Sequence, residues 1–204
     1  RNMSRNDKDK MRKLALLLLL CPLMMMAENR VVQSPDGRMK VKVSVEDGIA
    51  TYAVAYDGEE MLCPSRLGLQ SNIGDFTKGL TFVEAKESKV EKHYDMTRTK
   101  ASHVDFMANQ LEVTLADAKQ HQVIVTFVVS DNDIAFRYTL LRQENDNPKS
   151  AVITSEASSF LFPEGTTTFL SPQSIPMVGW ERTKPSYEEE YTADRPMTAK
   201  SQQG

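Results

Sequence analysis

Apolar and polar residues alternate along most of the chain after Arg30, which is the pattern of half-buried β-strands. From Met39 to Val45, apolar residues alternate with lysine and serine. A Glu46-Asp47-Gly48 turn leads into a second alternating stretch ending at Tyr56, where Asp57-Gly58 predicts a hairpin. A further strand is expected over residues 61–69, with Pro64 at an edge or bulge.

The clearest strands lie between Gln110 and Leu141. Two alternating stretches flank residues 123–129, which are apolar on both faces, as in a central strand between two layers. Turns at Asp117-Ala118-Lys119 and Asp131-Asn132-Asp133 separate the three stretches. This region predicts a three-stranded antiparallel meander.

The remaining pattern is less regular. We expect strands over residues 80–83, 88–94, 152–162 and 166–170, and a polar piece at 93–106 that runs along a surface. No stretch after residue 30 has helical periodicity. The predicted fold is all-β, a large antiparallel β-sandwich of the super-sandwich type. We expect it to be incomplete at its C-terminal end, since residues 198–204 add no closing strand.

The first residues have the features of an export signal. Arg12 and Lys13 precede an apolar run, and Ala27 is a small residue at a plausible cleavage point, so residues 11–27 are expected to be a signal peptide after an unstructured extension at 1–10. The run is too short, and too interrupted by Pro22, to predict a membrane span. Lipidation of Cys21 is the alternative, but no small residue precedes it.

Removal of residues 1–27 makes the chain more acidic. These residues hold six of the 25 basic and two of the 28 acidic residues, which leaves a net charge of −7. An acidic exported protein is a poor candidate for binding nucleic acid or anionic membranes. Cys63 would be the one remaining cysteine, so no intrachain disulfide is possible. The expected location is the periplasm or the extracellular space.

Common catalytic motifs are absent from the sequence: there is no nucleophile elbow, zinc-protease helix, phosphate loop or dinucleotide fingerprint. His93, His103 and His121 are not at metal-ligand spacing and are expected at the surface or in a turn. Cys63 has no neighbouring base, so a buried or inert thiol is expected. Asp131-Asn132-Asp133 lacks the rest of a calcium loop and favours a hairpin turn.

The strongest candidate chemistry lies between Gly179 and Pro196. Three carboxylates, Glu188, Glu189 and Glu190, stand between Tyr187 and Tyr191, and the single tryptophan, Trp180, lies upstream. In an extended segment Glu188 and Glu190 share a face, and Glu189 lies on the other with the two tyrosines. Clustered carboxylates suit calcium, and aromatic side chains suit a sugar face. The alternative is an acidic, solvated loop.

The chain after the signal peptide resembles the N-terminal domain of glycoside hydrolase family 97, exported glucosidases and galactosidases typical of Bacteroidetes. The resemblance rests on the order of several stretches: VVQSPDGRMKVKVSVEDGIATYAVAYDGEEMLCPSRLGLQ (31–70), IAFRYTL (134–140), ITSEASSFLFPEGT (153–166) and SYEEEY (186–191). The piece 94–104 is slightly more similar to the retaining galactosidase branch.

This resemblance implies a β-sandwich followed by a (β/α)8 barrel, which carries the catalytic carboxylates and is missing from this chain. It also implies that a glutamate of the sandwich helps to hold calcium beside an α-glucoside or α-galactoside substrate. That role falls to Glu188 first and Glu190 second, with Glu189 still possible, and Tyr187, Tyr191 and Trp180 would contact sugar. The fragment itself should be inactive. The family contains inverting and retaining members, which differ in the separation of their carboxylates.

Two further hypotheses remain open. One is a non-catalytic carbohydrate-binding module in which Trp180, Tyr187 and Tyr191 form a stacking platform. The other is a purely structural domain of the periplasm or cell surface. The sequence that follows Gly204 discriminates between them and the glycosidase, because a (β/α)8 pattern there would favour the enzyme.

Overall fold

The computed structural model describes residues 28–98, 100, 102–142, 150–170 and 192–200, and these residues form β-strands and no helix. The strands are β1 (Glu28–Gln33), β2 (Met39–Glu46), β3 (Ile49–Tyr56), β4 (Glu59–Arg66), β5 (Leu69–Ser71), β6 (Thr81–Asp95), β7 (His103–Ala116), β8 (Gln122–Ser130), β9 (Ile134–Leu140), β10 (Ile153–Glu156), β11 (Thr167–Leu170) and β12 (Thr192–Pro196). No helix that could cross a membrane is found among these described residues.

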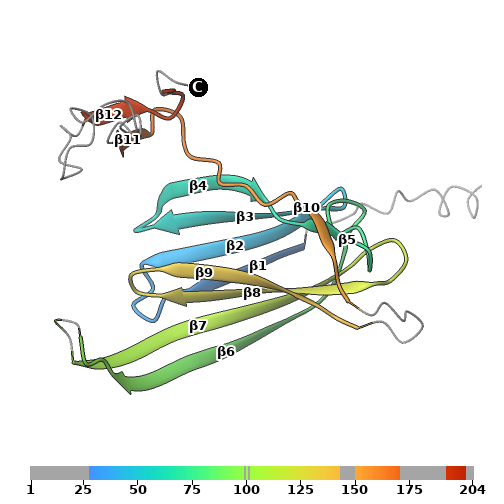
Figure 1. Cartoon of the computed structure of the whole chain (residues 1–204), viewed down its shortest axis with the longest axis horizontal. Coiled ribbons are helices and arrows are strands. Elements are labelled where there is room, and N and C mark those ends of the chain that lie inside the picture. Colours follow the sequence, from blue (N-terminus) through green and yellow to red (C-terminus); the bar gives the residue numbers. More distant parts are fainter. Residues whose placement is uncertain (1–27, 99, 101, 143–149, 171–191, 201–204) are drawn as a thin grey trace, which may run out of the picture.

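Two four-stranded sheets make up the body of the domain, in the orders β1-β2-β3-β4 and β6-β7-β8-β9, and neighbouring strands are antiparallel. Two small sheets, β5 with β10 and β11 with β12, complete the described strands. Figure 1 shows the two large sheets stacked on each other and the β11–β12 pair standing away from them. The predicted all-β sandwich and the meander at 110–141 are confirmed.

The core lies between the two large sheets, because the alternating apolar residues of each sheet point at the other. In β8, Val123, Val125, Phe127 and Val129 are all at most 1% exposed, while Ile124 and Val128 on the other face are half-buried. From the facing sheet the core receives valines and an aromatic ring: Val32, Val41, Val43, Tyr52 and Val54. Residues 123–129 are therefore an interior strand of their sheet, as predicted, but among the described strands a facing sheet covers only one of its faces, and Ile124 and Val128 on the other are half-buried.

The hairpin turns follow the residues expected of them. Asp47 and Gly48 both have positive φ, 50° and 74°, and Asp57 and Gly58 have φ of 51° and 88°. Two consecutive residues with positive φ define a type I′ turn, whose twist matches that of the flanking strands. The strand partners Glu46 with Ile49 and Tyr56 with Glu59 enclose these two-residue loops.

The largest departure from the predicted strands is β6. The sequence suggested separate strands at 80–83 and 88–94 followed by a polar surface piece, but one long strand, β6, pairs with β7 up to Asp95 and His103. A register shift between Phe82 and Glu84 explains the mixed pattern, because a bulge moves the alternation to the other face. The piece at 93–106 is exposed as expected, but it forms the end of a hairpin.

Other strand boundaries also differ. The strand expected at 61–69 is divided into β4 and β5 around Gly68, whose φ is 138° and whose Cβ, if present, would collide with the Phe76 carbonyl. The strand expected at 152–162 is confined to β10, and the next residues form only an isolated bridge between Cys63 and Leu161. Strand β12 was not predicted.

Candidate functional site

The side chains predicted to bind calcium and sugar, Trp180, Tyr187, Glu188, Glu189, Glu190 and Tyr191, lie outside the described residues. The strands that flank their segment are described. Strand β11 ends at Leu170 and β12 begins at Thr192, and these two residues are partners in the antiparallel ladder. The segment with the three glutamates therefore begins and ends at one place on a two-stranded ribbon.

Backbone hydrogen bonds attach the chain before β11 to the edge of the sandwich. The Ala157 amide donates to the Gly68 carbonyl at 2.8 Å, the Ser159 amide to Arg66 at 3.0 Å, and the Cys63 amide to the Leu161 carbonyl at 2.8 Å. Residues 157–161 thus lie along β4 as an extended strap. The strap fixes the point from which β11 leaves the sandwich.

Two aromatic side chains, the buried Tyr52 and the half-buried Tyr138, support the strap from below. The Tyr138 hydroxyl accepts a hydrogen bond from the Gly68 amide at 2.8 Å and lies 2.6 Å from the Ser158 hydroxyl. The Tyr52 hydroxyl donates to the Ser159 carbonyl at 3.1 Å. Burial raises the pKa of both tyrosines, so both remain neutral donors near neutral pH.

Beyond the strap lies an apolar depression of about 540 Å³ between the strap and the end of β12. Four apolar side chains that line it form what we call the Phe160 surface: Phe160, Leu161, Phe162 and Met197, with exposed fractions of 61%, 55%, 41% and 47%. Glu164 is the single charged residue among the described ones that line the depression. Such a surface suits an apolar or aromatic partner rather than an ion.

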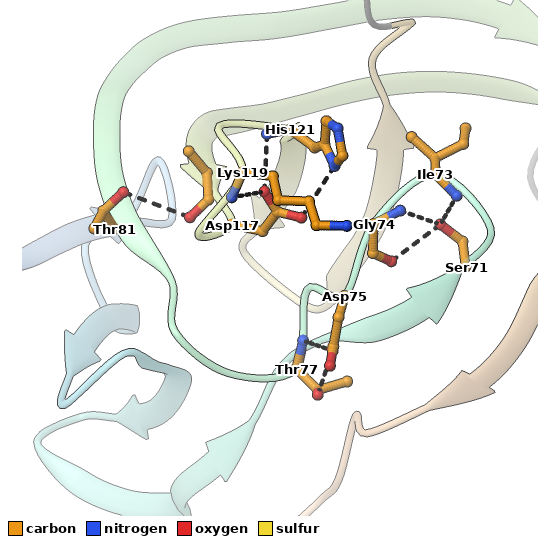
Figure 2. Close-up of polar contacts among 10 residues, drawn as sticks. Ser71, Ile73, Gly74, Asp75, Thr77, Thr81, Asp117, Lys119 and His121 are labelled. Carbon is orange, nitrogen blue, oxygen red and sulfur yellow. Dashed lines mark hydrogen bonds and ion pairs between the residues drawn. The ribbon is translucent and has the colours of Figure 1, made fainter. Parts of the chain in front are cut away.

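A second concave region, also about 540 Å³, is lined mostly by polar residues and lies where the β7–β8 turn meets the loop after β5 (Figure 2). Asp117, 5% exposed, accepts hydrogen bonds from the backbone amides of Lys119 at 2.8 Å and His121 at 2.9 Å, and its second oxygen lies 3.1 Å from the His121 ring. A Cβ on Gly74 would lie 2.9 Å from Asp117, so the two loops are closely packed. The Asp117 carboxylate therefore organises a turn, as predicted for residues 117–119.

The Ser71 side chain holds the other wall of this polar region in the same way. Its hydroxyl oxygen accepts from the amides of Ile73 and Gly74, both at 3.2 Å (Figure 2). Throughout the described residues, no buried side-chain polar atom lacks a hydrogen-bond partner. The Asp117 carboxylate and the Ser71 hydroxyl thus hold the two loops of this region in place.

Two histidines and three carboxylates meet at the exposed end of the β6–β7 hairpin. One Asp105 oxygen lies 2.6 Å from His93 Nδ1 and 3.1 Å from His103 Nε2, while Asp95 binds His103 and Glu91 binds His93. Asp105 and then Glu91 raise the pKa of His93, and chiefly Asp95 raises that of His103. The surface location predicted for both histidines is confirmed. Their pairing was missed, although it follows from the ladder once the register is known.

Metal-binding geometry is absent from the part of the chain that the structure describes: no group of three histidine, cysteine or acidic side chains could hold an ion there. Cys63 is free and half-buried, and desolvation, followed by its contact with Glu60, raises the pKa of the thiol, as expected of an inert cysteine. The Asp131-Asn132-Asp133 turn connects β8 to β9, and the Asp131 carboxylate accepts a hydrogen bond from the Asp36 backbone amide at 2.9 Å. It is the predicted hairpin turn.

Comparison with known families decides what this sandwich is. The model of the family described as "Glycosyl-hydrolase 97 N-terminal" matches residues 32–204. The chain belongs to this family. The predicted resemblance is therefore confirmed, and the strap and the β11–β12 ribbon are parts of a glycosyl hydrolase 97 N-terminal domain. The comparison with curated proteins gave no match.

Solved structures agree with this assignment. A β-arabinopyranosidase shares 46% identity with a TM-score of 0.73, over 86% of this chain and 28% of that one. Family 97 enzymes of Pseudoalteromonas sp. strain K8, in complex with panose and with acarbose, each share 22% identity with a TM-score of 0.63, over 71% of this chain and 22% of theirs. At that identity they show the fold alone. The domain thus spans less than a third of these structures.

Proposed function

We propose that this domain is the N-terminal part of an exported, calcium-dependent, exo-acting glycosidase, and that a (β/α)8 barrel following it carries the catalytic carboxylates. The observation that carries the proposal is the 46% identity to a β-arabinopyranosidase, over 86% of this chain. Because the domain spans 28% of that protein, the larger part of such an enzyme would lie beyond Gly204.

The proposed substrates are α-galactosides and β-arabinopyranosides, with α-glucosides as the alternative. In the L series, a β-arabinopyranoside has the same arrangement of ring hydroxyl groups as a D-series α-galactoside, which carries an additional hydroxymethyl group. A site built for one of these sugars is therefore close in shape to a site for the other. The similarity of residues 94–104 to the galactosidase branch supports the same substrate class.

The contribution of this domain would come from the segment between β11 and β12. Glu188 and Glu190 are the proposed calcium ligands and Tyr187, Tyr191 and Trp180 the proposed sugar contacts. Carboxylate oxygens are the donors that calcium prefers, and it takes six to eight oxygens from several segments. Bound calcium would supply positive charge beside the substrate. The ladder partners Leu170 and Thr192 would hold both ends of the segment against the barrel.

The chemistry itself needs groups that this chain does not supply. Hydrolysis of a glycosidic bond requires two carboxyl groups placed on either side of that bond. A single glutamate cluster on one loop cannot provide both. The purified 204-residue chain should therefore release no nitrophenol from nitrophenyl α-galactoside, β-arabinopyranoside or α-glucoside, and the full-length protein should hydrolyse the first two fastest. A full-length protein inactive on all three would contradict the proposal.

The calcium role is tested with a matched pair of substitutions in the full-length protein. Glu188→Gln removes a charge at constant size and should lower calcium affinity and activity together, with activity partly restored by excess calcium. Glu189→Gln, on the other face of an extended segment, should do much less. Calcium affinity is measured by titration calorimetry after chelation. If the two effects are reversed, Glu189 is the ligand, and if neither variant changes affinity, the cluster is a solvated loop.

A further inference from the structure

The Phe160 surface combines features that are unusual for a free surface. Its four side chains are 41–61% exposed, and three of them, Phe160, Leu161 and Phe162, are consecutive. Contiguous exposed apolar residues on a soluble domain mark contact sites, because their burial by a partner is favourable. Charge is nearly absent from the described lining, where Glu164 is the exception.

The backbone beneath this surface is already fixed. The Leu161 amide donates a hydrogen bond to the Ser65 hydroxyl at 2.8 Å, and the Leu161 carbonyl accepts one from the Cys63 amide. The centroid of the Phe160 ring lies 6.4 Å from the ring centroids of both Tyr52 and Phe136. The side chains are therefore presented outward by a segment tied to the core. A preformed surface binds a partner without the entropy cost of ordering itself.

The neighbouring β11–β12 ribbon also lacks support of its own. Within the described strands, β11 and β12 pair with each other and with no third strand. A two-stranded ribbon is marginally stable in water unless another element packs on it. Met197 and Thr198 line the apolar depression directly after β12, so the chain that continues toward Gly204 starts from this surface.

We propose that the Phe160 surface is the docking site for the part of the same polypeptide that follows Gly204. The domain spans 28% of the β-arabinopyranosidase with which it shares 46% identity, which leaves ample chain to cover the surface. This inference rests on the proposed function in one respect, that a further domain follows. Docking here would fix the β11–β12 ribbon, and with it the glutamate segment, relative to the rest of the protein.

The test uses the full-length protein and limited proteolysis of the chain just after Gly204. Leu161→Asp places a charge on the surface, and docking should weaken, so that this junction is cleaved about ten-fold faster, equivalent to ~1.4 kcal/mol. Met197→Asp, outside the strand ladders, should act in the same direction. Met107→Asp is the matched control, because Met107 on β7 is as exposed as Leu161, at 55%, and lies away from the surface. It should leave the cleavage rate unchanged.

Three results would overturn the proposal. The first is equal cleavage in Leu161→Asp, Met197→Asp and Met107→Asp. The second is a dimer in sedimentation that Leu161→Asp dissociates while the junction stays protected, which would assign the surface to a second copy. The third is an oligosaccharide that binds and covers the surface while the cleavage rate of the junction after Gly204 stays the same. Activity is measured separately: a protein inactive on glycosides, but with a junction exposed by the two surface variants, would refute the proposed function and leave the docking intact.

Discussion

Replacing Phe127 with alanine tests the sandwich at its centre. Phe127 is fully buried in β8, and its ring lies 5.6 Å from that of Tyr52 in the facing sheet and 5.5 Å from that of Phe136 in β9. Its side chain therefore contributes to packing both between the sheets and within one sheet.

Removal of a buried phenylalanine side chain costs about 3–5 kcal/mol through lost burial and the cavity that remains. The two lost ring contacts favour the upper part of that range, since an aromatic pair contributes about 0.5–1.5 kcal/mol beyond its area. Domains of this size are stable by roughly 5–15 kcal/mol, so Phe127→Ala should remove a large share of the free energy of unfolding.

Urea unfolding followed by far-ultraviolet circular dichroism measures this loss. Phe169→Ala is the matched control, since it removes the same atoms from a side chain that is 65% exposed, and it should change the free energy by less than about 0.5 kcal/mol. A loss below about 1 kcal/mol for Phe127→Ala, or equal losses for both variants, would refute the placement of Phe127 in the core.

Three other predictions concern the turns, the strap and the histidines. Gly68→Ala should destabilise the domain by more than about 1 kcal/mol in urea unfolding, and more than Gly58→Ala, because only at Gly68 does the added Cβ also meet backbone. Tyr138→Phe should cost about 1–3 kcal/mol by leaving the Gly68 amide without its acceptor, and should speed hydrogen exchange of that amide. Asp105→Asn should lower the raised pKa of His93 toward its usual 6.5 in an NMR titration. Because the folded pKa of His93 is raised and that of Asp105 is lowered, the stabilisation by this pair is present between the two values. It is lost as the pH rises through the folded pKa of His93, and also in acid as Asp105 becomes protonated. An unchanged His93 titration would show that the contact does not form in solution.

The sequence predicted β2, β3, the second half of β7, β8 and β9 well because each has one face in the core, so burial imposes a period of two on its residues. The prediction failed where a strand has no fully buried face. Strand β6 has no buried residue, and its bulge between Phe82 and Glu84 shifts the phase. Residues 157–161 hydrogen-bond along β4, but they form only one isolated bridge, at Leu161, and Phe160 and Leu161 are more than half exposed. The apolar residues of this stretch therefore predicted a longer strand than the one that forms.

The chemistry of the glutamate cluster stays a prediction, because its residues lie outside the described ones, and the sequence did not show the strands that flank it. The glutamate cluster is visible as consecutive letters, but the pairing of Leu170 with Thr192 joins residues far apart in the chain, and no local signal marks β12. In the same way, His93 and Asp105 become neighbours only through the register of β6 and β7. Contacts of this kind depend on tertiary structure rather than on local pattern.

The order of the strands has a consequence for how the domain folds. Within each large sheet every strand pairs with its neighbour in sequence, so both sheets can form from hairpins with short loop closures, which favours fast folding. The pairing of β10 with β5 and the strap along β4 join residues more than 80 positions apart and must wait for the sheets. Segments that are added late to a folded core are also the ones that can open locally while the core stays folded. The strap and the ribbon that it supports should therefore exchange their amide hydrogens by a local opening that leaves the sandwich folded.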